Sequence, residues 1–275
     1  MRQEHPSLDE LRQRVQKKRH REIGNLLARR YARPTAVYGT WLAVRLGLSA
    51  NQVTLTALTC SVAGAFAIGT GIRESFVLGV VLLHAAFWLD HVDGQVARWR
   101  KTASLDGVYF DYMMHHAAGS LLGFALGFGL ARRLGDVNWT IAGFAIALGW
   151  GFLSLHNDCR YKAFFQRLKS AAGSFRVDGG SGGKPSPPAK PPVKPFRLAV
   201  WLGYKACESH VVLVGLSLLA ALAVVDPQTW VAAWKTATFV MAITAPILAI
   251  LRIARSIHRQ SAEKEFSRWF RPISS

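Results

Sequence analysis

Residues 90–115 read DHVDGQVARWRKTASLDGVYFDYMMH, and this stretch guides the interpretation of the whole chain. Apolar segments flank it on both sides, so its charged residues are expected on membrane helices. Carboxylates at membrane depth are costly, and a cluster of them indicates a functional site. At 3.6 residues per turn, Asp90 and Asp93 point within about 60° of each other, and Asp111 and His115 within about 40°. Two helix faces therefore offer three carboxylates and an imidazole to one space.

This set of side chains predicts a divalent metal site. Hard oxygen ligands suit Mg²⁺ or Mn²⁺, and such ions typically neutralise and orient the phosphates of a substrate. Gly94, Ala97 and Gly107 have almost no side chain, which leaves room for a ligand or a neighbouring backbone. The stretch therefore predicts metal binding at Asp90, Asp93 and Asp111 next to a phosphate-bearing substrate.

The same spacing closely resembles the signature of the CDP-alcohol phosphotransferase family, Asp-x2-Asp-Gly-x2-Ala-Arg-x8-Gly-x3-Asp-x3-Asp. Seven of the eight signature positions match, namely Asp90, Asp93, Gly94, Ala97, Arg98, Gly107 and Asp111, and His115 stands in place of the fourth Asp. The resemblance implies that the first three carboxylates hold metal ions and the CDP diphosphate. It also implies that Gly94, Ala97 and Gly107 admit the nucleotide, and that Arg98 contacts phosphate or braces the carboxylates.

His115 has two interpretations. In the family the fourth Asp is taken to be the general base on the acceptor hydroxyl, and an imidazole suits that role because its unperturbed pKa is about 6.5. Alternatively, the exchange marks a weakened or inactive relative. In either case the metal site has one negative charge fewer, so a second metal ion should be held less tightly than in relatives with four Asp residues.

The chain as a whole has the composition of a membrane protein. It has 275 residues, 51% of them hydrophobic, with nine Trp and with 34 Lys and Arg against 16 Asp and Glu. We expect an all-α integral membrane fold with six transmembrane helices, because six apolar segments approach the length of about 20 residues that spans a bilayer. The segments are approximately Val53 to Ile72, Ser75 to Arg98, Val108 to Ala131, Trp139 to Phe164, Ser209 to Val225 and Trp230 to Ile253.

The positive charges predict the orientation. With both termini on one side, all but four of the 34 Lys and Arg residues fall on that side, the exceptions being Arg73, Arg132, Arg133 and Lys235. This asymmetry predicts cytoplasmic termini and a cytoplasmic active site. We expect a protein of the bacterial inner membrane.

Three regions are expected along the chain. Residues 1–35 form a basic amphipathic helix that starts with a capping box of Ser7 and Glu10 and lies on the membrane surface. Residues 36–260 form the membrane domain, in which the Gly- and Pro-rich segment 171–196 is a mobile loop. Residues 261–275 are a cytoplasmic tail. With six spans behind the basic segment, we expect it to bind membrane lipids and no nucleic acid.

Further residues have two interpretations each. The sequence Ala50-Asn51-Gln52-Val53-Thr54 is similar to a Pro-Asn-x-x-Thr motif of the family, which implies that Asn51 and Thr54 contact the cytidine nucleotide. Ordinary helix capping by Ser49 or Asn51 explains it equally well. Arg160 and Lys162 either contact an acceptor phosphate or lipid headgroup, or merely anchor the chain.

Two features bear on packing. Gly119, Gly123 and Gly127 let their helix pack closely, either within the bundle, which we favour, or across a homodimer. The three Cys residues are scattered, so neither a zinc site nor a disulfide framework is indicated.

The residues and the resemblance together lead to a functional hypothesis. We expect a membrane enzyme of phospholipid synthesis that transfers a group from a CDP-activated donor, with CDP-diacylglycerol favoured, to a hydroxyl acceptor and releases CMP. One alternative is an aminoalcohol phosphotransferase that uses a soluble CDP-alcohol and a lipid acceptor. Another is a catalytically silent lipid-binding relative.

Overall fold

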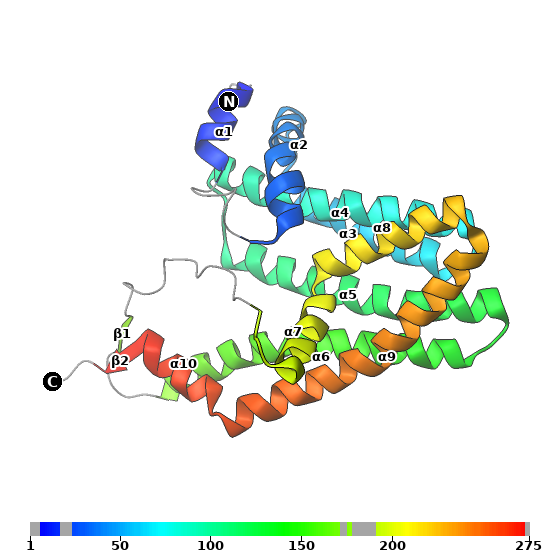
Figure 1. Cartoon of the computed structure of the whole chain (residues 1–275). Helices are drawn as coiled ribbons and strands as arrows, with labels where there is room; N and C mark the ends of the chain where they lie inside the picture. Colours follow the sequence, from blue (N-terminus) through cyan, green and yellow to red (C-terminus); the bar gives the residue numbers. More distant parts are fainter. Residues whose placement is uncertain (1–5, 17–23, 171–174, 178–190, 273–275) are drawn as a thin grey trace.

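The computed structural model describes residues 6–16, 24–170, 175–177 and 191–272, and these residues form a helical bundle (Figure 1). The helices in chain order are α1 (Leu8–Val15), the π-helix η1 (Ala28–Ala32), α2 (Arg33–Arg45), α3 (Ala50–Gly69), α4 (Arg73–Arg100), α5 (Leu105–Leu134), α6 (Asn138–Ser170), α7 (Pro195–Ala206), α8 (Ser209–Val225), α9 (Pro227–His258) and α10 (Ser261–Trp269). Two short strands, β1 (Phe175–Val177) and β2 (Phe270–Pro272), pair antiparallel.

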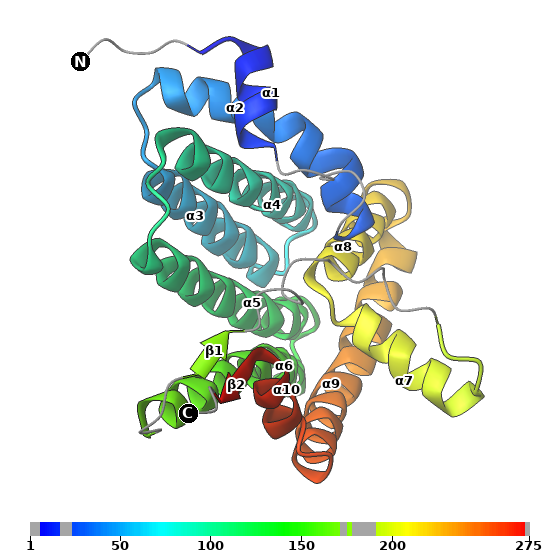
Figure 2. The same cartoon turned by 90° about the vertical axis from the view of Figure 1, so that its left-hand side faces the viewer.

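The long helices lie side by side in an order that largely follows the chain. Helix α3 packs on α4 and on α5, α5 packs on α6, and α6 packs on α9, while α8 packs on α4 and α9. Helices α1, α2 and α10 lie at one end of the bundle, and the connections α3 to α4, α5 to α6 and α8 to α9 lie at the other (Figures 1 and 2). The connections thus alternate between the two ends, as a multispan membrane protein requires.

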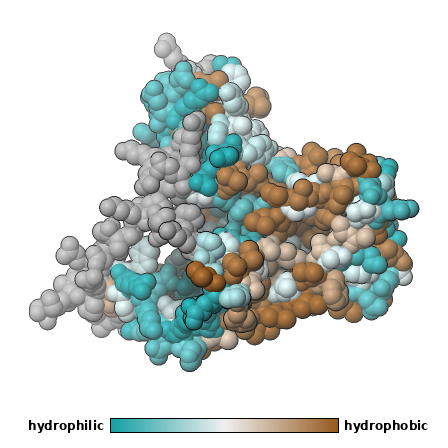
Figure 3. All heavy atoms as spheres, in the orientation of Figure 1, coloured by the Kyte–Doolittle hydropathy of each residue, from teal (hydrophilic) through white to brown (hydrophobic). Residues whose placement is uncertain are grey.

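The helices fit an integral membrane protein. Within the described residues, α3, α4, α6 and α9 are long and apolar enough to cross a membrane, and the pair α7 and α8, bent by 75°, adds a fifth crossing if it is one span. Figure 3 shows a broad apolar surface over the long helices, with hydrophilic residues gathered toward the ends. Each of the six predicted apolar segments corresponds to a helix, but the count of six crossings stays a prediction.

The glycines of α5 divide into two groups. A Cβ atom at Gly123 would lie 2.9 Å from the backbone of Ala147, and one at Gly127 would overlap the backbone of Gly143, so both positions require glycine where α5 meets α6. A Cβ at Gly119 would meet nothing within 4 Å. Gly123 and Gly127 therefore serve the packing of the bundle, as favoured from the sequence, whereas Gly119 leaves open space.

The basic amphipathic helix expected over residues 1–35 is described only in part, because residues 1–5 and 17–23 lie outside the described residues. The capping box of Ser7 and Glu10 is present, but α1 has only eight residues. Its apolar residues Leu11 and Val15 are fully buried against a cluster of Val37, Trp41 and Trp99. Burial of two such side chains contributes about 1.5–3 kcal/mol each. The apolar face of α1 is therefore largely covered by α2 and α4.

Of the C-terminal segment 261–275, the described residues 261–272 contact the rest of the bundle. Phe266 of α10 is buried and meets Phe164 of α6 edge to face, with ring centroids 5.7 Å apart. Arg167 of α6 forms an ion pair with Glu263 of α10. Of the segment 171–196 expected to be a mobile loop, residues 175–177 form β1 and residues 195–196 start α7. Residues 171–174 and 178–190 lie outside the described residues.

Candidate active site

The site forms between α4 and α5, near the turn that joins them. Helix α4 ends at Lys101, whose φ of 54° is left-handed, and α5 starts at the N-cap Ser104, whose Oγ accepts a hydrogen bond of 3.0 Å from the Gly107 backbone. The two helices then run in opposite directions, with α3 packed against both. This arrangement sets Asp90 of α4 opposite Asp111 of α5, as the sequence predicts.

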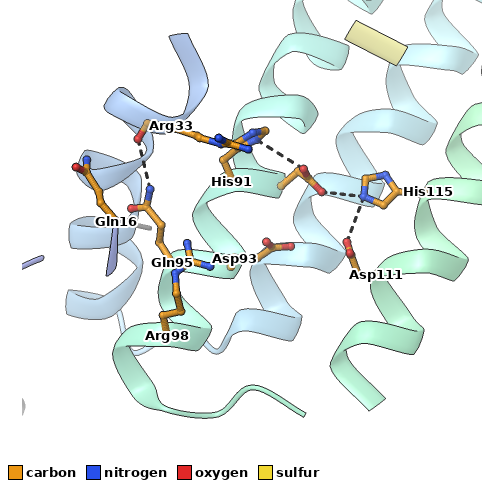
Figure 4. A pocket seen from close by; sticks show the side chains of 10 residues that line it. Gln16, Arg33, His91, Asp93, Gln95, Arg98, Asp111 and His115 are labelled. Carbon is orange, nitrogen blue, oxygen red and sulfur yellow. Dashed lines mark hydrogen bonds and ion pairs between the residues drawn. The ribbon is translucent and has the colours of Figure 1, made fainter. Parts of the chain in front are cut away.

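Asp90, Asp111 and His115 converge on one point (Figure 4). The Nε2 atom of His115 lies 3.1 Å from Oδ1 of Asp90 and 3.3 Å from Oδ1 of Asp111. One ligand atom from each residue lies within 4.8 Å of the other two, which is close enough to hold one metal ion. Two carboxylate oxygens and one imidazole nitrogen suit a divalent cation such as Mn²⁺ or Mg²⁺.

Asp93 is oriented by a neighbour on α3. The hydroxyl of Thr54 donates a hydrogen bond of 2.7 Å to Oδ2 of Asp93, and Thr54 is itself buried. Asp93 is not part of the three-residue convergence, although it points into the same space from the helical turn after Asp90. Thr54, which the resemblance assigned to the nucleotide, therefore reaches the site through a carboxylate.

Two cavities meet at these residues. One is mainly polar, measures about 270 Å³ and is lined by Arg33, Gln95 and Arg98 among others. The other measures about 330 Å³ and extends between α3, α4, α5 and α8 along mostly apolar side chains that include Leu58, Leu213 and Leu216. The residues that line both are Asp90, His91, Asp93, Asp111 and His115. The carboxylates thus stand between a polar and an apolar compartment.

The polar cavity has a cationic and amide wall opposite the carboxylates. Arg33 begins α2, and burial, followed by the charge of Arg29, lowers the pKa of its guanidinium. Gln95 is buried; its Oε1 accepts a hydrogen bond of 2.9 Å from Thr40, and its Nε2 donates one of 3.4 Å to the Arg33 carbonyl. These bonds hold α4 and α2 together, so the wall is fixed on packed helices.

The remaining signature residues are distributed around this centre. Gly94 lines the polar cavity, where an added Cβ would lie 3.3 Å from the Arg98 guanidinium. Arg98 donates its Nε hydrogen to the carbonyl of Val15 at 2.7 Å and also lines the cavity. A Cβ at Gly107 would lie 3.8 Å from Oδ1 of Asn51, so these two residues are neighbours at the α4 to α5 turn.

Three of the predicted nucleotide contacts stand apart from the cavities. Asn51, Ala97 and Gly107 are not among the described residues that line either one. Capping explains part of the motif around Asn51, because Ser49 forms a capping box with Gln52.

Arg160 and Lys162 also lie away from the described lining of both cavities. Arg160 donates a hydrogen bond of 2.7 Å to Glu265 of α10, which holds the docked C-terminal helix, and Lys162 is exposed on α6. Arg160 therefore has an internal ion-pair partner, which the sequence did not indicate.

Sequence reasoning missed four residues of the polar cavity: Gln16, Arg33, His91 and Gln95. His91 and Gln95 lie inside the signature at positions that the motif leaves free. At 3.6 residues per turn they point about 100° and 140° away from Asp90, so helical spacing does not place them beside it. Gln16 and Arg33 come from the N-terminal region, and only the packing of that region against α4 brings them to the site.

The comparisons with known proteins agree with the signature. Residues 48–164 match the family model of CDP-alcohol phosphatidyltransferase, so this part of the chain is similar to that family. The match supports a transferase that moves a phosphate-linked alcohol from a CDP-alcohol, and divalent metal is known in the family. A search of the curated proteins found no match. The resemblance inferred from the sequence is confirmed.

Proposed function

We propose that the protein is a membrane enzyme of phospholipid synthesis that transfers a phosphatidyl group from CDP-diacylglycerol to a hydroxyl acceptor and releases CMP. The observation that carries this proposal is the meeting of a polar and an apolar cavity at Asp90, Asp93, Asp111 and His115. A lipid-linked nucleotide has one end for each compartment, and its diphosphate would lie between them, at the carboxylates.

The substrate groups are assigned by chemistry. Arg33 and Arg98 supply positive charge to the polar cavity, which favours the phosphates and the nucleotide. Leu213 and Leu216 of α8 line the apolar cavity together with Gly119, which leaves open space. This cavity favours the binding of an acyl chain. Asp90, Asp93 and Asp111 would hold Mg²⁺ or Mn²⁺ against the diphosphate. When bound, such an ion stabilises negative charge on the phosphate oxygens.

The reaction requires one proton transfer and one exchange at phosphorus. The acceptor hydroxyl oxygen forms a bond to the phosphorus that carries the diacylglycerol, and the bond from that phosphorus to the CMP oxygen breaks. We propose that His115 takes the proton of the acceptor hydroxyl, because its imidazole is more than half exposed, at 57%, and contacts both carboxylates. The alternative assignment of His115 is a metal ligand, which its distances also allow.

The runner-up is transfer from a soluble CDP-alcohol to a lipid acceptor. The same cavities accommodate it, with the acyl chain belonging to the acceptor. CMP release by the purified protein in lipid nanodiscs separates the two, when CDP-diacylglycerol with a panel of polar alcohols is compared with CDP-aminoalcohols plus diacylglycerol. We expect release with the first donor and none from an Asp93→Asn variant. Release with the second donor alone would establish the runner-up, and no release with any donor would favour the silent relative.

We further propose that 36–260 is one membrane domain of six spans, with termini and site in the cytoplasm of a bacterial inner membrane. The charge asymmetry and the common end of α1, α2 and α10 support this orientation. Cysteine labelling tests this orientation. Val193 is 96% exposed and is replaced by Cys in a variant whose exposed Cys159 is replaced by Ser. A membrane-impermeant maleimide should label it only in opened cells. Labelling of intact cells would reverse the orientation.

A further inference from the structure

The helix α1 is joined to the active site through the signature arginine. The carbonyl of Val15, the last residue of α1, accepts the 2.7 Å hydrogen bond from Nε of Arg98. The side chains of Leu11 and Val15 are fully buried and pack against Trp41 and Trp99. A specific polar contact and an apolar interface therefore both hold α1 beside the polar cavity.

Gln16 is the residue after α1 and lines the polar cavity. Its backbone is extended, with φ −75° and ψ 126°, so the chain leaves the helix at this residue. Its half-buried side chain lines the cavity together with Arg33 and Gln95, and no hydrogen-bond partner is found for it among the described residues. Figure 4 places Gln16 on the side of the cavity opposite Asp111 and His115. Gln16 thus presents its amide to the far end of the site.

We propose that α1 is a lid on the polar cavity and that Gln16 contacts the nucleobase. The inference rests on the proposed function, because it takes the diphosphate to lie at Asp90 and Asp111. With the phosphates at that end, the base lies at the other end, where Gln16 is. An amide has a carbonyl acceptor and an NH₂ donor, and cytosine presents an amino donor beside acceptors. The Gln16 amide can therefore form hydrogen bonds with the edge of the base.

This role lies outside the part of the chain that the family model covers. The match starts at residue 48, whereas Gln16, α1 and Arg33 precede it. Recognition of the base by this segment is therefore a property of this chain beyond the signature chemistry.

Nucleotide binding tests the base contact. The full-length protein in nanodiscs with Mg²⁺ is titrated with CDP and with inorganic pyrophosphate, which has no base, as wild type, Gln16→Ala and Gln13→Ala. Gln13 is the matched control, because it is the same residue type exposed on α1. We expect Gln16→Ala to lose about 10-fold in CDP affinity, the typical worth of one base contact, with little change for pyrophosphate, and Gln13→Ala to resemble wild type.

The outcomes separate this inference from the proposed function. If wild type binds CDP and Gln16→Ala binds CDP as tightly as wild type, the base contact is wrong and the proposed function stands. If wild type binds no CDP, both are overturned. An equal loss for CDP and pyrophosphate would make Gln16 a general structural residue and would also overturn the base contact.

Limited proteolysis tests the lid. Trypsin cuts after Arg12 and Arg14 only when α1 is undocked. A ligand that binds the docked state increases the population of that state. We expect CDP with Mg²⁺ to slow this cleavage in wild type. Leu11→Asp should undock α1, make cleavage fast with or without CDP, and weaken CDP binding, while size-exclusion elution shows that the bundle is intact. Cleavage independent of CDP in wild type, or normal CDP affinity of Leu11→Asp, would overturn the lid.

Discussion

The hydrogen bond from Thr54 to Asp93 gives a sharp test of the site, because one hydroxyl can be removed without changing the volume of the side chain. The bond is 2.7 Å long and Thr54 is only 8% exposed, so in Thr54→Val little room exists for a water molecule to replace the lost donor. A hydrogen bond to a charged group is worth about 1.5–3 kcal/mol. If that energy acts on the carboxylate that meets the metal and the diphosphate, the loss in activity is about 10- to 100-fold, typical of residues that orient metal ligands.

The assay is CMP release by purified protein in nanodiscs at varied metal concentration, with thermal unfolding measured in parallel. Thr59→Val is the matched control, because the Thr59 hydroxyl bonds only to the Leu55 carbonyl on an exposed part of the same helix. We expect Thr54→Val to need more metal for half-maximal rate or to turn over more slowly, and Thr59→Val to resemble wild type. A rate for Thr54→Val within about twofold of wild type, or an equal fall for Thr59→Val, would refute the reasoning, since the bond would then be worth less than about 0.5 kcal/mol.

Other predictions concern the base, the metal and the packing. His115→Ala should turn over at least about 100-fold more slowly while binding metal and CDP nearly normally; loss of metal binding would instead identify His115 as a ligand. Asp90→Asn should raise the metal concentration needed for turnover, measured by adding Mn²⁺ back after chelation, and an unchanged requirement would remove Asp90 from the metal site. Gly127→Leu should lower the unfolding temperature because its Cβ would overlap the backbone of α6, whereas Gly119→Ala, with nothing within 4 Å, should not. Equal unfolding temperatures for the two glycine variants would contradict the close approach of α5 and α6.

The convergence of Asp90, Asp111 and His115 could be predicted from the sequence, because helical periodicity determines which residues share a face and the α4 to α5 turn is short. The close packing at Gly123 and Gly127 was predictable for the same reason, since small residues four apart form one stripe on a helix. The placement of the apolar segments followed from hydropathy.

The partners of these residues came only from the tertiary structure. Thr54 and Asp93 are 39 residues apart, and Val15 and Arg98 are 83 apart. No local pattern specifies such pairs, because they depend on how whole helices dock. For the same reason the sequence did not indicate that packing buries Leu11, Val15 and Phe266 within the protein.

The sequence by itself therefore determined the apolar helices and the convergence of Asp90, Asp111 and His115, because both depend on spacing within one or two neighbouring helices. The tertiary structure alone decided that a polar and an apolar cavity meet at these residues and that Gln16 lines one side of the polar cavity. A cavity is bounded by side chains from elements far apart in the chain, and its shape is set by the angles at which α2, α3, α5 and α8 pack around α4.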